Sequence, residues 1–198
     1  MAHLAPGESI SKEVLDDPFA ASRFTTPKMS KRQSDLVGNL GNGNLVSTIG
    51  NTDGCPISTK VALIGIVTDC SYTSSFTSRE AVRESIIAMV NSASLLYENS
   101  FNIAIGLRNI IISDAECLST GPEPAPWNIP CANGNLGERL DLFSTWRGLR
   151  QDDNAYWTLM TGCSTGNTVG IAWVGQLCSS ELSTSIVVRT PTEWQVFA

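Results

Sequence analysis

The pattern of apolar and polar residues changes sharply near residue 60. Residues 1–59 are rich in Ser, Gly, Asn and Asp and show little periodicity, which predicts an extended or disordered segment. Residues 61–67 then form a continuous apolar run, which is typical of a strand buried on both faces. We therefore interpret residues 1–59 as a linker segment and residues 60–198 as the folded part of the chain.

A helix between two strands is predicted at the start of the folded part. Residues 77–80 match a capping box, which marks the beginning of a helix. Apolar residues then recur at spacings of three and four, which indicates an amphipathic helix; they are Val82, Ile86, Met89, Val90, Ala93 and Leu96. Residues 102–112 form the next predicted strand, and the three elements should cross over right-handed into a parallel pair.

The second half of the chain adds one predicted helix and three β segments. The helix covers residues 135–151, and the β segments cover residues 155–161, 169–177 and 185–190. Pro191 then begins the opening turns of a further helix. This order of elements predicts an α/β fold with a mixed, mostly parallel twisted sheet and flanking helices.

Composition excludes two classes of partner. The formal net charge of −6 argues against nucleic acid, because binding phosphates needs a basic surface. No run of about 18 apolar residues occurs, so no membrane span is predicted. The first residues lack the basic end and apolar core of a signal peptide. We therefore expect either that the true N terminus lies further upstream or that the chain is an internal piece of a longer precursor.

The six cysteines indicate disulfides and an oxidising compartment. No C-x-x-C pair occurs, which argues against a thiolate metal site. Cys117 and Cys131 have the shortest separation and are the expected local pair, which would staple the proline-rich loop of residues 121–127. The other pairings stay open at this level.

The chain contains a single histidine, His3, in its polar N-terminal stretch. Serine and cysteine hydrolases of the usual kind need a histidine base, and catalytic zinc sites usually need two or three histidines. The 198 residues therefore do not contain a complete active site of either type.

Three segments resemble the catalytic domain of the reprolysin/ADAM-type metzincin proteases. Residues 61–69 are similar to its first strand, which ends in an aspartate, and residues 92–103 to its passage from first helix to second strand. Residues 153–162 resemble its third strand, which begins with D-N-A. The implied fold is the N-terminal part of a metzincin catalytic domain.

A fourth segment is similar to the substrate-binding edge strand of the same family. Gly170, Ala172, Gly175 and Cys178 match its G-x-A-x-x-G-x-x-C pattern. The resemblance then covers residues 61–198 and is closest to the fungal ADAM group. Small residues allow another backbone to approach and pair by strand addition. We therefore expect a peptide-binding edge formed by Gly170, Ile171, Ala172, Trp173 and Val174; the alternative is an ordinary sheet edge with a bulge.

The resemblance implies a zinc metalloendopeptidase of the secretory pathway, either secreted or the ectodomain of a membrane-anchored protein. Its substrates would be extended peptides or proteins, cleaved by a metal-activated water. In the family, the helix matching residues 191–198 continues into the zinc motif H-E-x-x-H-x-x-G-x-x-H. The resemblance thus implies that the chain stops just before this motif. Zinc is expected for the full-length protein, whereas the 198 residues alone are expected to hold no metal and to be inactive.

The resemblance has further implications for single residues. The partner of Cys178 is expected beyond the zinc motif. Family members that bind calcium use an aspartate matching Asp153 and an acidic residue in the first strand, where this chain has Ala62, so no calcium is expected. Lys31 and Arg32 form a dibasic pair that would suit removal of a prosegment ending within residues 1–59; the alternative is two adjacent charges in a loop.

Two other functions compete with the protease. Asp69, Ser71 and Thr73 fit the D-x-S-x-[ST] pattern with which von Willebrand A-type binding modules hold magnesium, and hard oxygen ligands suit that ion. The second alternative is a non-catalytic interaction protein that keeps the peptide groove without zinc.

Overall fold

The computed structural model describes residues 55–163, 166 and 168–190. The linker up to residue 54, the dibasic pair Lys31 and Arg32, and the helix predicted from Pro191 lie outside the described residues. The predictions made for them stay predictions.

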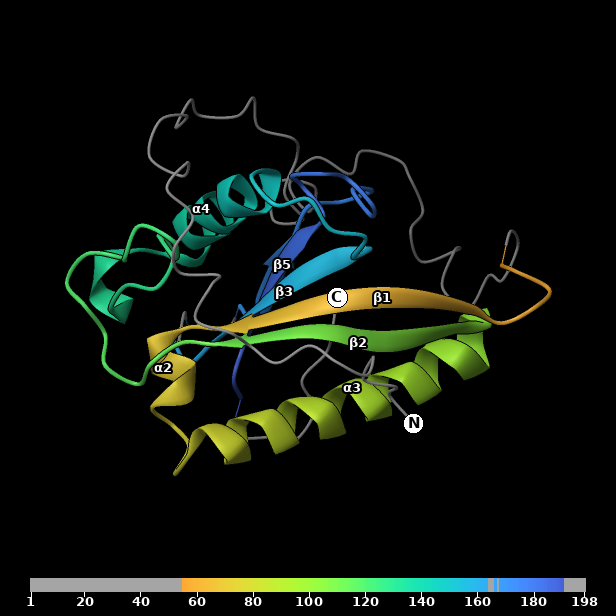
Figure 1. Cartoon of the computed structure of the whole chain (residues 1–198), viewed down its shortest axis with the longest axis horizontal. Helices are drawn as coiled ribbons and strands as arrows, with labels where there is room; N and C mark the ends of the chain where they lie inside the picture. Colours follow the sequence, from red (N-terminus) through yellow and green to blue (C-terminus); the bar gives the residue numbers. More distant parts are fainter. Residues whose placement is uncertain (1–54, 164–165, 167, 191–198) are drawn as a thin grey trace.

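A five-stranded sheet in the order β2-β1-β3-β5-β4 forms the centre of the described fold (Figure 1). Strand β1 pairs in parallel with β2 and β3, β3 pairs in parallel with β5, and only β4 runs antiparallel to its neighbour β5. The predicted mixed, mostly parallel sheet is therefore confirmed. The strands are β1 (Lys60–Thr68), β2 (Ile103–Ile112), β3 (Tyr156–Thr161), β4 (Gly170–Ala172) and β5 (Thr184–Val188).

Helix α3 (Arg79–Phe101) covers one face of the sheet and packs mainly on β2. Its cap is Ser78, one residue later than the predicted box implied, and the Ser78 side chain accepts a hydrogen bond from the amide of Ala81. The helix ends at Phe101, and the next residue, Asn102, caps it in the left-handed conformation with φ of 58°. The predicted strand–helix–strand unit is confirmed.

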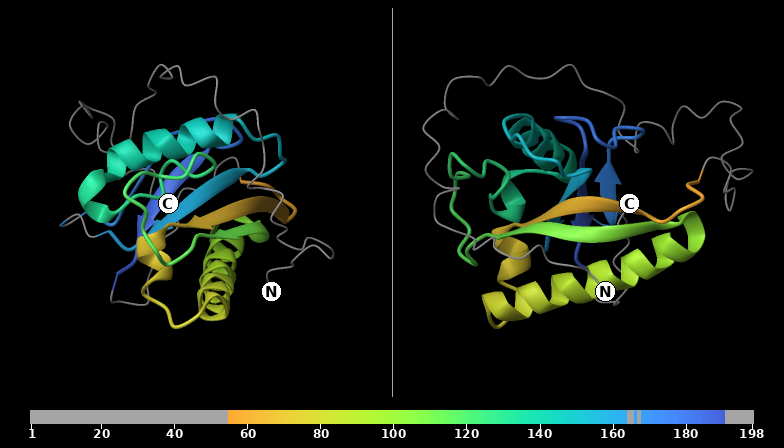
Figure 2. Two further views of the ribbon diagram at one scale, coloured as in Figure 1. Left: turned by 60° about the vertical axis from the view of Figure 1, so that its left-hand side comes forward. Right: turned by 45° about the vertical axis from the view of Figure 1, so that its right-hand side comes forward.

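Helix α4 (Leu136–Gly148) lies on the opposite face, so the sheet separates the two helices (Figure 2). Asn135 and Glu138 form a complete capping box at its start. The helix ends at Gly148, three residues before the predicted limit. Its apolar face packs with Trp127 and Trp157 into a buried cluster separate from the cluster under α3.

The structure adds a short helix, α2 (Cys70–Thr73), that the apolar pattern does not reveal. Asp69 caps it by accepting a hydrogen bond from the amide of Tyr72 at 2.8 Å. One turn is too short to show helical periodicity, and its signal in the sequence is the Asp-to-Ser/Thr-rich stretch after a buried strand.

The predicted strand over residues 169–177 is much shorter in the structure. Only Gly170–Ala172 form β4, and the chain then turns. Gly175 has a φ of +72° and Cys178 a φ of +62°, both in the left-handed region that no strand continues through. The prediction that this strand lies at the edge of the sheet is confirmed, whereas the predicted length of nine residues is wrong.

The expected Cys117–Cys131 disulfide is wrong. Cys117 pairs with Cys70 in α2, and Cys131 pairs with Cys163 just after β3, with Cα–Cα distances of 5.2 Å in both bridges. The loop between β2 and α4 lies across the ends of β1 and β3, so each cysteine meets a strand end rather than its neighbour in sequence. Cys55 and Cys178 are free thiols in the structure.

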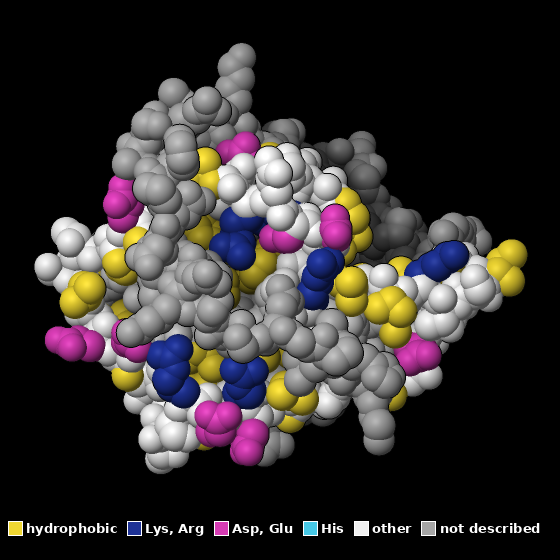
Figure 3. Space-filling model, viewed as in Figure 1, with side chains coloured by type: hydrophobic (Ala, Val, Ile, Leu, Met, Phe, Trp, Pro, Cys, Tyr) yellow, Lys and Arg dark blue, Asp and Glu magenta, His cyan; other side chains and the backbone are white. Residues whose placement is uncertain are grey.

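Charged side chains of both signs are interspersed on the face shown in Figure 3. Within the described part of the chain, no helix combines the length and apolar character needed to cross a bilayer.

Candidate functional site

Strand β4 is an edge of the sheet, and β5 is its only strand neighbour among the described residues. Gly170, Ile171 and Ala172 lie opposite Val187, Ile186 and Ser185. The amide of Val188 donates to the carbonyl of Val169 at 2.8 Å, so residues 169 and 188 form a hydrogen-bonded pair.

Hydrogen-bonded and non-bonded pairs alternate along an antiparallel ladder. Ile171 therefore directs its backbone N–H and C=O toward β5. Gly170 and Ala172 direct theirs away from β5, to the side of β4 where no other described strand lies. These outward groups are the ones that an added peptide strand would pair with.

The side chains of the edge divide between the two faces of the sheet. Ile171 and Trp173 are each 6% exposed and pack in the cluster beneath α4. Gly170 and Ala172 present almost no bulk, and Val174 is exposed. The five predicted residues are therefore arranged in two ways: Gly170 and Ala172 turn their backbone groups away from β5, Ile171 and Trp173 bury their side chains, and the Val174 side chain is exposed.

Gly170 is required for a reason that the sequence did not suggest. A Cβ atom at this position would lie 2.8 Å from the carbonyl oxygen of Ile186, closer than such contacts allow. The glycine therefore lets β4 approach β5, rather than making room on the outer side.

The opposite edge of the sheet, strand β2, is partly covered by α3. The Ser94 hydroxyl accepts a hydrogen bond from the amide of Ile105 at 2.9 Å, and the Arg79 guanidinium donates to the carbonyl of Ile112. Side chains that satisfy edge groups block strand addition. Among the described residues, no such side-chain bond caps the outward groups of β4, so the two edges differ in accessibility.

A buried ion pair organises the ends of β1 and β3 near the start of α4. Asp69 is fully buried, and its carboxylate lies 3.5 Å from the Arg139 guanidinium, which is also fully buried. Asp69 accepts hydrogen bonds from Thr161 at 2.5 Å and from Ser71 at 2.6 Å. Arg139 also donates to backbone carbonyls of the preceding loop, at Trp127, Ile129 and Pro130.

Burial lowers the pKa of the Arg139 guanidinium from its ordinary value, and the Asp69 carboxylate opposes that shift. Arg139 was not among the residues predicted from the sequence. The sequence feature that could have indicated a buried arginine is its place on the same face of the predicted helix as the apolar residues Leu136, Leu140 and Phe143.

This arrangement does not fit the alternative function, a magnesium site formed by Asp69, Ser71 and Thr73. A guanidinium and hydroxyl donors already occupy the Asp69 oxygens. The Thr73 hydroxyl bonds to Thr68 at 2.9 Å instead of turning toward Asp69. The three side chains do not converge on one point that a cation could fill.

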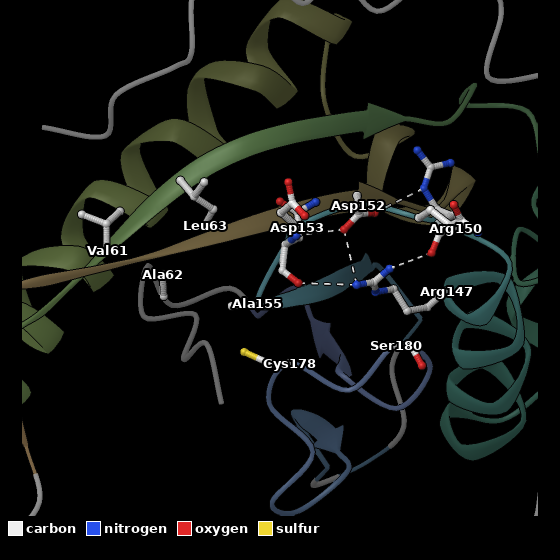
Figure 4. A pocket seen from close by; sticks show the side chains of 12 residues that line it. Val61, Ala62, Leu63, Arg147, Arg150, Asp152, Asp153, Ala155, Cys178 and Ser180 are labelled. Carbon is white, nitrogen blue, oxygen red and sulfur yellow. Dashed lines mark hydrogen bonds and ion pairs between the residues drawn. The ribbon is translucent and has the colours of Figure 1, made fainter.

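A pocket of about 610 Å³ lies where β1 and β3 begin (Figure 4). Ala62 and Asp153 line it, together with Cys178. Arg147 is buried at its rim and lies 3.4 Å from Asp152. The lining of the pocket therefore combines apolar residues of β1 with charged groups of both signs.

The comparisons with known proteins identify the family. The reprolysin model of metallo-peptidase family M12 matches residues 58–198. The chain belongs to this family. The match confirms the resemblance that the edge strand and the D-N-A segment suggested.

Curated members of the family give the same result. The chain is 52% identical over 183 residues to the disintegrin and metalloproteinase domain-containing protein B of Aspergillus fumigatus, a match covering 86% of this chain and 23% of that protein. The protein of the same name from Arthroderma otae is 43% identical over 190 residues, covering 85% and 24%. The zinc metalloprotease mde10 of Schizosaccharomyces pombe is 27% identical over 150 residues, covering 67% and 28%. The chain thus spans about a quarter of the length of these relatives.

Membership of the M12 family implies a catalytic metal, and the described residues do not fit one. No three His, Cys, Asp or Glu side chains among them are arranged to hold an ion, and His3 lies outside the described part. A catalytic zinc needs three such protein ligands and an open position.

The two positions that the family resemblance associates with calcium, Ala62 and Asp153, are labelled in the pocket of Figure 4. Ala62 and Asp153 line the same pocket, but the Ala62 methyl group has no oxygen to offer. Asp153 is highly exposed and pairs with Arg108 at 3.5 Å. Cys178 lies at this pocket with an exposed thiol; its expected partner beyond the zinc motif stays a prediction.

Proposed function

We propose that the full-length protein is a zinc-dependent endopeptidase and that β4 binds its substrate in extended form. One observation supports this most strongly: in a chain of the M12 family, the backbone groups of Gly170 and Ala172 face away from β5, at an edge where the described residues place no further strand. A substrate strand that pairs with these groups would present a straight peptide, which is the form that endoproteases bind.

We further propose that the zinc ligands and the general base come from sequence outside these 198 residues. The relatives are about four times as long as the matched segment, and the single histidine here cannot supply a zinc triad. The 198-residue chain by itself should then neither bind zinc stoichiometrically nor cleave peptides.

The secretory pathway is the proposed location, because the two disulfides suit an oxidising compartment. In that setting Lys31 and Arg32 would be the processing site between a prosegment and the mature domain. Sequencing the N terminus of the secreted protein checks this proposal.

The function of the edge can be tested with a proline at position 172 in the full-length protein. The Ala172 amide makes no ladder bond to β5, so Ala172→Pro should preserve the fold while removing a donor from the free edge. Peptide cleavage should fall by about tenfold or more, with Tm nearly unchanged.

The matched control is Ile171→Pro. The Ile171 amide belongs to the ladder with β5, so this substitution should lower Tm clearly. Full cleavage activity in a folded Ala172→Pro protein would sink the proposed role of the edge.

A further inference from the structure

The end of β4 is held by a buried hydrogen bond between its anchoring tryptophan and helix α4. Trp173 follows the last residue of β4, and its indole Nε1 donates to the Ser144 hydroxyl at 2.8 Å. Ser144 is fully buried in the middle of α4. The indole thus connects the edge strand directly to the helix that covers the sheet.

The Ser144 hydroxyl makes three hydrogen bonds, which use its one donor and both acceptor positions. Its proton goes to the Leu140 carbonyl at 2.8 Å, and Thr184 lies 2.7 Å away. A hydroxyl offers one donor and two acceptor positions, so the Thr184 hydroxyl must donate to Ser144. Ser144 therefore accepts from Trp173 and from Thr184 at once.

This cluster joins the two antiparallel strands at the point where β4 ends. Trp173 directly follows β4 and Thr184 is the first residue of β5, and the side chains of both bond to the Ser144 hydroxyl. One serine on α4 thereby fixes the end of β4 and the beginning of β5 together.

Strand β4 needs such an anchor because it is three residues long and pairs on one side only, within the described fold. So few ladder bonds define register weakly. A small shift of β4 would move the outward N–H and C=O groups of Gly170 and Ala172, on which strand addition depends.

We propose that Trp173 and Ser144 are positioning residues for substrate binding: their hydrogen bond sets the place of the β4 edge without contact to the peptide. This inference rests on the proposed peptide-binding role of β4. It assigns Trp173 an inward, supporting role instead of a contact with substrate.

The test uses the full-length protein with Trp173→Phe and Ser144→Ala. The first keeps an aromatic ring but removes the N–H donor; the second leaves the Trp173 and Thr184 donors without their acceptor. Each should raise KM roughly three- to tenfold with kcat little changed, because binding is lost equally in ground and transition states. Hydrogen exchange of the Ile171 amide should accelerate by a similar factor.

Matched controls separate positioning from general loss of packing. Trp146→Phe removes the same indole N–H from the same aromatic cluster, and Thr145→Ala removes a hydroxyl that bonds back to the Asp141 carbonyl at 2.9 Å. Neither should change exchange at Ile171 selectively or alter KM beyond about twofold.

The outcomes distinguish the two proposals. Faster exchange at Ile171 with unchanged KM would overturn the positioning role, and so would unchanged exchange. A protein that cleaves no peptide at all would contradict the proposed function, whereas the exchange data would still report whether Trp173 and Ser144 hold β4.

Discussion

At the residue scale, the buried pair of Asp69 and Arg139 shows what the sequence can predict about a single residue and what it cannot. Asp69 stands out as the polar end of an apolar run, and its importance could be predicted. Its partner lies 70 positions later in the chain, and the nearby hydroxyls of Ser71 and Thr73 suggested a cation instead. A guanidinium supplied from another element cannot be recognised from local spacing.

Removing the Arg139 charge should destabilise the fold strongly. Arg139→Met leaves the Asp69 carboxylate buried without its counterion, and breaking such a pair costs about 3–5 kcal/mol. Urea unfolding measures the loss. Arg108→Ala is the control, because its partner Asp153 is largely exposed and such pairs contribute less than about 1 kcal/mol. Similar losses of unfolding free energy in both variants would contradict the claim that the buried pair contributes much more to stability than the exposed pair.

At the element scale, periodicity predicted the sheet and both long helices, because each buries a whole face. Residues 61–67 of β1 are all apolar, and the strand lies between the two buried clusters: Ile64 and Ile66 belong to the cluster under α3, and Val67 to the cluster under α4. Helix α2 and the end of β4 were not predictable in this way. One is a single turn, and the other is stopped by left-handed backbone at Gly175 and Cys178.

Cysteine pairing also belongs to the scale of elements. The shortest separation suggested Cys117 with Cys131, but the loop between β2 and α4 brings each of them to a strand end. Non-reducing peptide mapping should find Cys70 joined to Cys117 and Cys131 joined to Cys163. A peptide linking Cys117 to Cys131 would show that the loop lies elsewhere.

At the scale of the whole molecule, the two edges of the sheet are unlike each other. Side chains of α3 satisfy groups on the β2 edge, whereas β4 presents the backbone of Gly170 and Ala172 beside almost no side-chain bulk. The family and this edge could be predicted from the sequence, because small residues at fixed spacing carry the signal. The anchoring of the edge through Ser144 could not, since a serine within a helix shows no partner in its sequence.

The most direct test of the account is hydrogen exchange of the β4 amides in the full-length protein, with and without an uncleaved substrate-derived peptide. Strand addition should slow exchange at Gly170 and Ala172 by about tenfold or more. Exchange at Ile171 should stay the same, because that amide already bonds to β5. Protection along β2 instead, or none at Gly170 and Ala172 with the peptide bound, would contradict the claim that β4 is the substrate-binding edge.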